Sequence, residues 1–173
     1  FYCFKVKPEQ ILNPEHIMER FIISGIQQIG LGVPDVQLGW RWARKNFGFD
    51  VPIFQDSAEA PFMTRYTGGK VQSRTATLAV NLMGGGGFEI WQYTSRKPEP
   101  PASAPLLGDL GIFTARIKTP NAQAAFEFLK RQDVDLLSGM SKDPSGTPFF
   151  FVKDLFGNIF QVIESGNFFM KKP

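Results

Sequence analysis

Thr147-Pro-Phe-Phe-Phe-Val-Lys-Asp-Leu-Phe-Gly-Asn-Ile-Phe-Gln-Val-Ile-Glu164 is the stretch that decides the fold. It contains two β-prone runs, Phe149 to Val152 and Ile159 to Ile163, on either side of Asp154-Leu-Phe-Gly-Asn158. Gly157 and Asn158 tolerate the positive φ that a tight connection needs. The stretch therefore predicts a β-hairpin close to the end of the chain.

An earlier stretch repeats this pattern. Thr75 to Met83 lead through four glycines, Gly84 to Gly87, into Phe88-Glu-Ile-Trp-Gln-Tyr93. Phe88-Glu89-Ile90 then aligns with Phe160-Gln161-Val162. This match predicts two copies of one unit, in which a polar residue between two apolar ones is the repeated feature.

The segments before each hairpin also match. Ile26 to Val33 alternates apolar and polar residues as a strand does, and Asp35 can cap a following helix. Gly111 to Lys118 alternates in the same way, and Asn121 takes the place of Asp35. The predicted helices use the apolar stripes Val36, Trp40, Ala43, Phe47 and Ala122, Ala125, Phe126, Leu129. Second strands are predicted at Asp50 to Gln55, an edge or interrupted strand because of Pro52, and at Val134 to Leu137. Each copy therefore has the order β-α-β-β-β.

The repeat divides the chain into parts. We expect an N-terminal extension at 1–25, module one at 26–94, a proline-rich linker at 95–107, module two at 108–166 and a tail at 167–173.

Composition excludes several function classes. The chain has 173 residues, 43% of them hydrophobic, and a net charge of +3 with scattered basic residues, so we expect a soluble globular protein that does not bind nucleic acid. No apolar run approaches the ~20 residues of a membrane span, so no membrane partner is expected.

Cys3 is the only cysteine, which favours a cytoplasmic protein, although a removed N-terminal signal stays open because the first residue is Phe1. His16 is the only histidine, which argues against zinc and non-haem iron sites, since these usually take two or three imidazoles.

The order of elements, together with Val33-Pro-Asp35, Phe88-Glu-Ile90 and Asp154-Leu-Phe-Gly-Asn-Ile-Phe160, resembles the vicinal oxygen chelate superfamily. This superfamily includes glyoxalases, extradiol dioxygenases, epimerases and antibiotic-binding proteins such as bleomycin resistance protein. The resemblance covers about Ile26 to Ser165. It implies an α+β fold in which two βαβββ modules form curved mixed sheets around a central cavity that takes a small-molecule ligand.

The resemblance also implies positions for metal ligands, because each module of the family usually gives one ligand from its first strand and one from its last. These positions fall on Gln28 and Glu89 in module one and on Gln161 in module two. The fourth falls on Thr114 if the two strand ends are aligned without a gap, or on Ile112 if the strand slides by two residues. Such oxygen donors with one negative charge suit Mg, Mn or Ca weakly and Zn or Fe(II) poorly. The expected cofactor is a divalent metal (Mg, Mn, Ni or Zn) or none.

Two functions remain open. The first is a glyoxalase-like or dioxygenase-like enzyme with a degenerate metal site that acts on a small oxygenated molecule, with Glu89 as the catalytic base. A glyoxalase-type lyase or isomerase is favoured, and extradiol ring cleavage is disfavoured because only one histidine is present. The second is a metal-free protein that sequesters an aromatic or hydrophobic molecule. The candidate substrate-binding residues are Trp91, Tyr93, Arg116 and Thr114. The modules can pair within one chain or between the two chains of a homodimer, and both arrangements stay open.

Overall fold

The structure is a computed structural model, and it describes residues 26–99, 102–109 and 111–166. The predicted extension, with Cys3 and His16, and the predicted tail lie outside the described residues.

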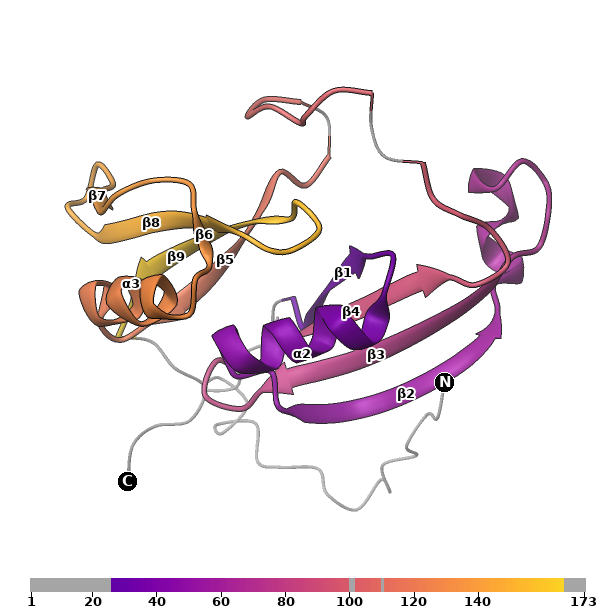
Figure 1. Ribbon diagram of the computed structural model, residues 1–173, viewed down its shortest axis with the longest axis horizontal. Helices are drawn as coiled ribbons and strands as arrows, with labels where there is room; N and C mark the ends of the chain where they lie inside the picture. Colours follow the sequence, from indigo (N-terminus) through magenta and orange to yellow (C-terminus); the bar gives the residue numbers. More distant parts are fainter. Residues whose placement is uncertain (1–25, 100–101, 110, 167–173) are drawn as a thin grey trace, which may run out of the picture.

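Module one forms a four-stranded sheet, called sheet A here. Its elements are β1 (Gln28–Gly32), α2 (Val36–Phe47), β2 (Val51–Glu59), the 3-10 helix η1 (Pro61–Tyr66), β3 (Ser73–Asn81) and β4 (Gly86–Tyr93). The strand order is β1-β4-β3-β2; β1 and β4 are parallel and the other pairs are antiparallel. The helix α2 lies across one face of this sheet (Figure 1).

Module two repeats the arrangement in sheet B. Its elements are β5 (Thr114–Thr119), α3 (Ala122–Arg131), β6 (Asp135–Leu136), β7 (Ser141–Lys142), β8 (Pro148–Lys153) and β9 (Ile159–Glu164). The order is β5-β9-β8-β6, with β5 and β9 parallel, and β7 pairs with β8 beside this path. The predicted α+β fold of two βαβββ modules is confirmed.

Two segments differ from the predicted elements. The strand predicted to end at Gln55 continues as β2 to Glu59, and η1 follows it. This part of β2 is exposed on both faces and pairs only with β3, so its sequence carries no apolar alternation. The two-residue strand β7 lies between the strand predicted at Val134 to Leu137 and the last hairpin, where the sequence predicts no element. A strand of two exposed residues has no period to detect.

The helix caps are equivalent in the two modules. Asp35 Oδ1 accepts a hydrogen bond of 2.8 Å from the Leu38 N–H, and Asn121 Oδ1 accepts one of 2.8 Å from the Ala124 N–H. Both helices therefore begin where the sequence predicts, because a side-chain oxygen satisfies a backbone donor of the first turn. Gly48, at a φ of 68°, ends α2.

The last strand of each module holds the start of its helix. Gln92 Oε1 accepts a hydrogen bond of 2.7 Å from the Val36 N–H, and Glu164 Oε2 accepts one of 3.0 Å from the Ala122 N–H. Gln92 and Glu164 occupy the same position in the aligned hairpins. One module uses an amide for this bond and the other uses a carboxylate.

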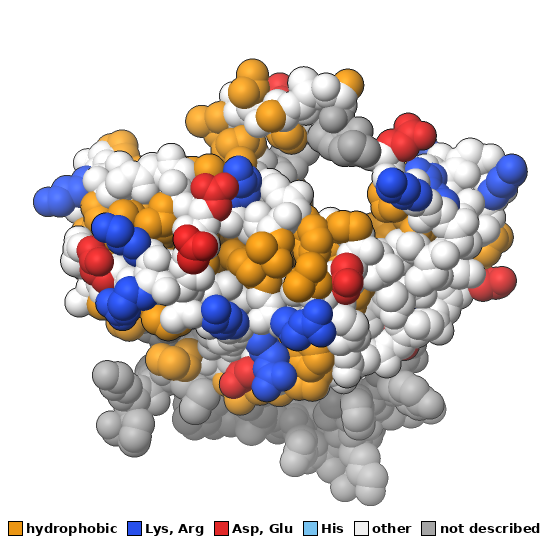
Figure 2. Space-filling view, viewed as in Figure 1, with side chains coloured by type: hydrophobic (Ala, Val, Ile, Leu, Met, Phe, Trp, Pro, Cys, Tyr) orange, Lys and Arg blue, Asp and Glu red, His pale blue; other side chains and the backbone are white. Residues whose placement is uncertain are grey.

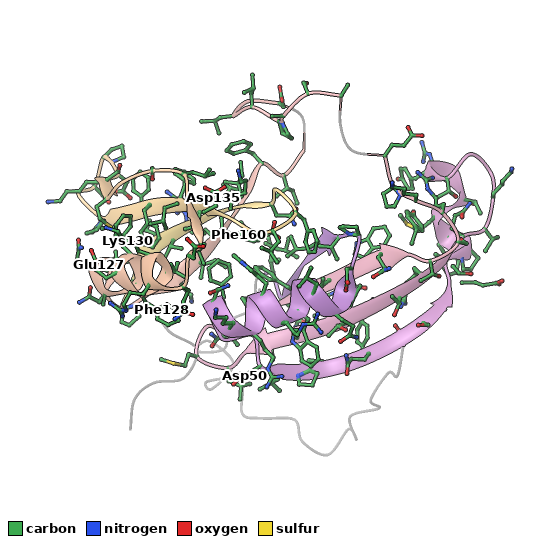
Figure 3. The ribbon with its side chains drawn as sticks, viewed as in Figure 1. Asp50, Glu127, Phe128, Lys130, Asp135 and Phe160 are labelled. Atoms are coloured by element: carbon green, nitrogen blue, oxygen red, sulfur yellow. The ribbon has the colours of Figure 1, made fainter. Side chains whose placement is uncertain are left out.

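The two modules share an aromatic core. Phe160 of β9 is 1% exposed, and its ring centroid lies 6.1 Å from that of Trp42, 5.2 Å from Phe47 and 5.4 Å from Phe88. Figure 3 shows Phe160 on the side of module two that faces α2. Figure 2 shows apolar side chains gathered where the two modules meet. The modules therefore pack on each other within one chain, and Phe88 and Phe160 are equivalent residues that meet at this junction.

No helix in the described part of the chain is long and apolar enough to cross a membrane.

Candidate functional site

The register of the first strands locates the candidate ligand positions. In module one, Gln28 of β1 lies opposite Gly87 of β4, and Gly30 lies opposite Glu89. Glu89 alternates along β4 with buried residues of the core, so its side chain lies on the face of sheet A opposite α2. Gln28 shares this face, which we call the open face of sheet A.

In module two, Thr114 of β5 lies opposite Ile159 of β9, and Arg116 lies opposite Gln161. Thr114 therefore occupies the first-strand position that the gap-free alignment predicts. Ile112 lies before β5 and is 80% exposed, so the alternative register is wrong. Arg116 stands where module one has a glycine.

Gln28 and Glu89 come together. Gln28 Nε2 donates a hydrogen bond of 2.7 Å to Glu89 Oε2. Gln28 is exposed and Glu89 is half-buried, and Glu89 Oε1 has no hydrogen-bond partner among the described residues. The pair therefore presents one carboxylate oxygen on the open face.

Two aromatic residues lie on the same strand face. The rings of Trp91 and Tyr93 meet edge to face at a centroid distance of 4.9 Å, and the Arg96 guanidinium lies 5.1 Å from the Tyr93 centroid. Trp91 Nε1 donates to no described residue. A Cβ at Gly30 would lie 3.7 Å from this nitrogen, and one at Gly32 would meet nothing within 4 Å. The two glycines of β1 thus leave space beside Trp91.

Module two uses its equivalent groups differently. Arg116 Nε donates a hydrogen bond of 2.9 Å to Gln161 Oε1, and Gln161 is 9% exposed. Thr114 Oγ1 donates to the Ile159 carbonyl at 3.0 Å. Gln161 therefore turns its amide oxygen toward a guanidinium, and the Thr114 hydroxyl proton is taken by the backbone. No hydrogen bond or ion pair between described residues joins this group to Gln28 or Glu89.

Solved structures with the same arrangement cover most of the chain. A glyoxalase family protein from Bacillus cereus gives a TM-score of 0.61 at 12% identity, over 84% of this chain and 95% of that one. A glyoxalase family protein from Enterococcus faecalis gives 0.61 at 15% identity, over 83% and 100%. Lactoylglutathione lyase from Agrobacterium tumefaciens gives 0.52 at 13% identity, over 84% and 96%. The chain has the vicinal oxygen chelate fold. No protein-family model matches the sequence, and no curated protein matches it significantly.

The side chains at the four ligand positions do not fit the divalent metal that the vicinal oxygen chelate fold implies. Among the described residues, no group of three or more His, Cys, Asp or Glu side chains could hold a metal ion. Module one offers the Glu89 carboxylate and the Gln28 amide oxygen. Module two offers the Gln161 oxygen, which already accepts from the positively charged Arg116. A divalent ion bound to the Gln161 oxygen would break its hydrogen bond with Arg116. The ion would also lie close to the positive charge of the guanidinium.

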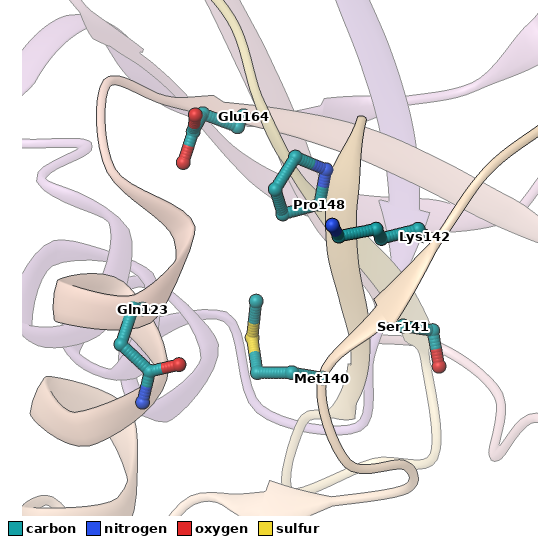
Figure 4. Close-up of a pocket in the computed structure, with 6 residues that line it drawn as sticks. All are labelled: Gln123, Met140, Ser141, Lys142, Pro148 and Glu164. Atoms are coloured by element: carbon teal, nitrogen blue, oxygen red, sulfur yellow. The ribbon is translucent and has the colours of Figure 1, made fainter. Parts of the chain in front are cut away.

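A pocket that the sequence did not predict lies in module two of this vicinal oxygen chelate fold. Its volume is about 350 Å³, and it is lined by Gln123, Met140, Ser141, Lys142, Pro148 and Glu164 (Figure 4). These residues come from α3, β7, β8 and β9 and the segment before β7, so no single motif contains them. The one signal in the sequence is the change from Gln92 to Glu164 between the aligned hairpins.

Proposed function

We propose that the protein binds a small aromatic molecule on the open face of sheet A and needs no metal to do so. The observation that carries the metal-free part of this proposal is the hydrogen bond from Arg116 to Gln161 at the module-two ligand position. Because a guanidinium is permanently charged, it disfavours a divalent ion at that position at any pH of interest.

The open face has the groups that such a ligand needs. Trp91 supplies a ring for stacking and an N–H that no described residue accepts, and Tyr93 supplies a second ring at its edge. Glu89 supplies a carboxylate oxygen two residues along the same strand face. An aromatic ring with a cationic substituent matches two of these groups, since the ring covers Trp91 and the cation pairs with Glu89.

A second candidate is a glyoxalase-like or dioxygenase-like enzyme with a degenerate metal site. The observation that favours it is the geometry of Glu89, whose Oε2 is held by Gln28 while Oε1 is left to take a proton. A general base needs such a fixed and accessible oxygen. Stabilisation of the protein by added Mn, Mg, Ni or Zn, after purification without chelator, would favour this candidate.

The test measures binding of three ligands that share one ring: tryptamine, indole and indole-3-acetate. Isothermal titration should give the order tryptamine, then indole, then indole-3-acetate, because only tryptamine pairs with Glu89. Trp91→Ala should weaken tryptamine binding by about 2 kcal/mol, or roughly thirtyfold in Kd. Glu89→Gln should weaken tryptamine by about tenfold and leave indole unchanged.

Matched controls lie elsewhere in module one. Phe62, in η1, is 95% exposed, and Glu59, on β2, points to the other face of sheet A. Phe62→Ala and Glu59→Gln should bind all three ligands as the parent does. Unchanged tryptamine affinity in Trp91→Ala would show that the open face is not the binding site.

A further inference from the structure

We propose a second small-molecule site in the module-two pocket, and we infer that it takes a small zwitterion with an apolar middle, such as a free amino acid with an aliphatic side chain. This inference is independent of the function proposed for sheet A, because it uses other residues on another sheet.

The pocket separates opposite charges across an apolar floor. Its volume of about 350 Å³ is at the small end of the range for ligand pockets. In Figure 4 the Glu164 carboxylate and the Gln123 amide lie on one side, and the Lys142 ammonium lies on the other. The Met140 side chain points between them, and the Pro148 ring lies beside Lys142.

Lys142 and Glu164 do not pair with each other. The ion pairs between described residues are Arg74 with Asp56 and Lys153 with Asp135, and neither lines the pocket. The Lys142 ammonium has no hydrogen-bond partner among the described residues. Two opposite charges thus line one pocket without neutralising each other, which leaves both able to pair with a ligand.

The charge of Glu164 exceeds what its structural role needs. Its Oε2 accepts from the Ala122 N–H at the start of α3, and Gln92 makes the same bond to Val36 with an uncharged amide. Glu164 Oε1 has no hydrogen-bond partner among the described residues. A negative charge is therefore present in module two where module one shows that an amide suffices.

The ligand chemistry follows from these groups. A carboxylate on the ligand matches the Lys142 ammonium. An ammonium on the ligand matches Glu164 Oε1 and the amide oxygen of Gln123, since the NH₂ group of Gln123 already donates to Glu127. An aliphatic side chain matches Met140 and Pro148. A free aliphatic amino acid carries all three groups in one small molecule.

The experiment titrates L-leucine into the ¹⁵N-labelled full chain and follows backbone amide shifts. L-Leucinamide, which lacks the carboxylate, and N-acetyl-L-leucine, which lacks the ammonium, are the matched probes. We expect leucine to shift the amides of Gln123, residues 140–142 and Glu164, and to bind at least about tenfold more tightly than either probe.

Two variants assign the charges. Lys142→Met should weaken leucine about tenfold and remove its advantage over leucinamide. Glu164→Gln, which keeps the bond to the helix start, should remove the advantage over N-acetyl-leucine. Lys130→Met, an exposed change at the end of α3, is the control and should bind as the parent does.

Absence of these shifts up to the solubility limit of leucine, or equal affinity of leucine and both probes, would overturn the proposal. Trp91→Ala should not affect leucine binding. If Trp91→Ala abolishes leucine binding, leucine binds at sheet A and the proposal of a module-two site is wrong. If the parent binds leucine but not tryptamine, only the function proposed for sheet A is refuted.

Discussion

Truncation of Phe160 tests whether the aromatic junction holds the two modules together. Phe160 belongs to β9, yet three of its ring neighbours, Trp42, Phe47 and Phe88, belong to module one. It is 1% exposed, so Phe160→Ala leaves a cavity that solvent does not fill. We expect a loss of about 3–5 kcal/mol in the free energy of unfolding. That is a large fraction of the 5–15 kcal/mol typical of a domain.

A double-mutant cycle separates the inter-module contact from burial within module two. The rings of Phe88 and Phe160 are tilted by 32° at a centroid distance of 5.4 Å. Rings at this distance are worth about 0.5–1.5 kcal/mol beyond their buried area. Phe88→Ala and Phe160→Ala should therefore be non-additive by about that amount.

The assay is urea unfolding followed by tryptophan fluorescence and by far-UV circular dichroism. The parent should unfold in one transition with both probes, because one core spans both modules. Leu155→Ala, at the exposed tip of the last hairpin, is the control and should change the stability by less than about 0.5 kcal/mol. Additive effects of the Phe88 and Phe160 truncations, within about 0.3 kcal/mol, would refute the shared junction.

Two further predictions concern a buried glycine and an acidic turn. Gly87→Ala should lower the free energy of unfolding by about 1–3 kcal/mol, because the added Cβ would lie 2.9 Å from the Ala79 carbonyl oxygen. Gly84→Ala is the control, since its Cβ has only one contact, at 3.9 Å. Thermal unfolding should show a loss of stability in Gly87→Ala and none in Gly84→Ala. The pKa of Asp143 lies below its ordinary value of 3.8, chiefly because the Ser145 hydroxyl donates to its carboxylate. A lowered pKa in the folded state gives stability that is present above the ordinary value and is lost as pH falls through the folded value. As the pH falls below about 4, Asp143→Asn should therefore lose less stability than the parent. Urea unfolding at a series of pH values measures this. An equal loss of stability in the parent and the variant would contradict it.

The fold was predictable because its signals are local and occur twice. The Asp154 to Asn158 turn, the caps at Asp35 and Asn121 and the alternation of β1 and β5 each specify a backbone state without reference to the rest of the chain. Their repetition at equivalent positions then indicates one architecture. The exposed end of β2 and the strand β7 gave no such signal, because their residues bury nothing.

The candidate site was predictable in part. Strand parity places Gln28, Glu89 and Trp91 on one face, and the structure brings the first two within 2.7 Å. The bond from Arg116 to Gln161 could not be read from the pattern, because parity fixes the face of a long side chain but not its rotamer. The roles of these residues in metal or substrate binding stay predictions.

The pocket in module two could not be predicted from the sequence. Its lining residues are separated by up to 41 positions along the chain, between Gln123 and Glu164, and only Pro148 and Glu164 belong to the hairpin stretch from Thr147 to Glu164. Only the fold brings them together. Comparison of the two modules position by position is the one route from the sequence to Glu164.

The junction at Phe160 has a consequence for the connector between β4 and β5. The described residues of this segment, which we call the arch, are exposed from Thr94 to Glu99 and from Ala102 to Asp109 (Figure 1). The modules are thus held by side-chain packing, and the covalent link mainly keeps them at a high local concentration. Each doubling of such a link costs only about 0.6 kcal/mol of loop-closure entropy. We therefore expect the described residues of the arch to tolerate insertion, cleavage or new termini, with the two halves remaining assembled.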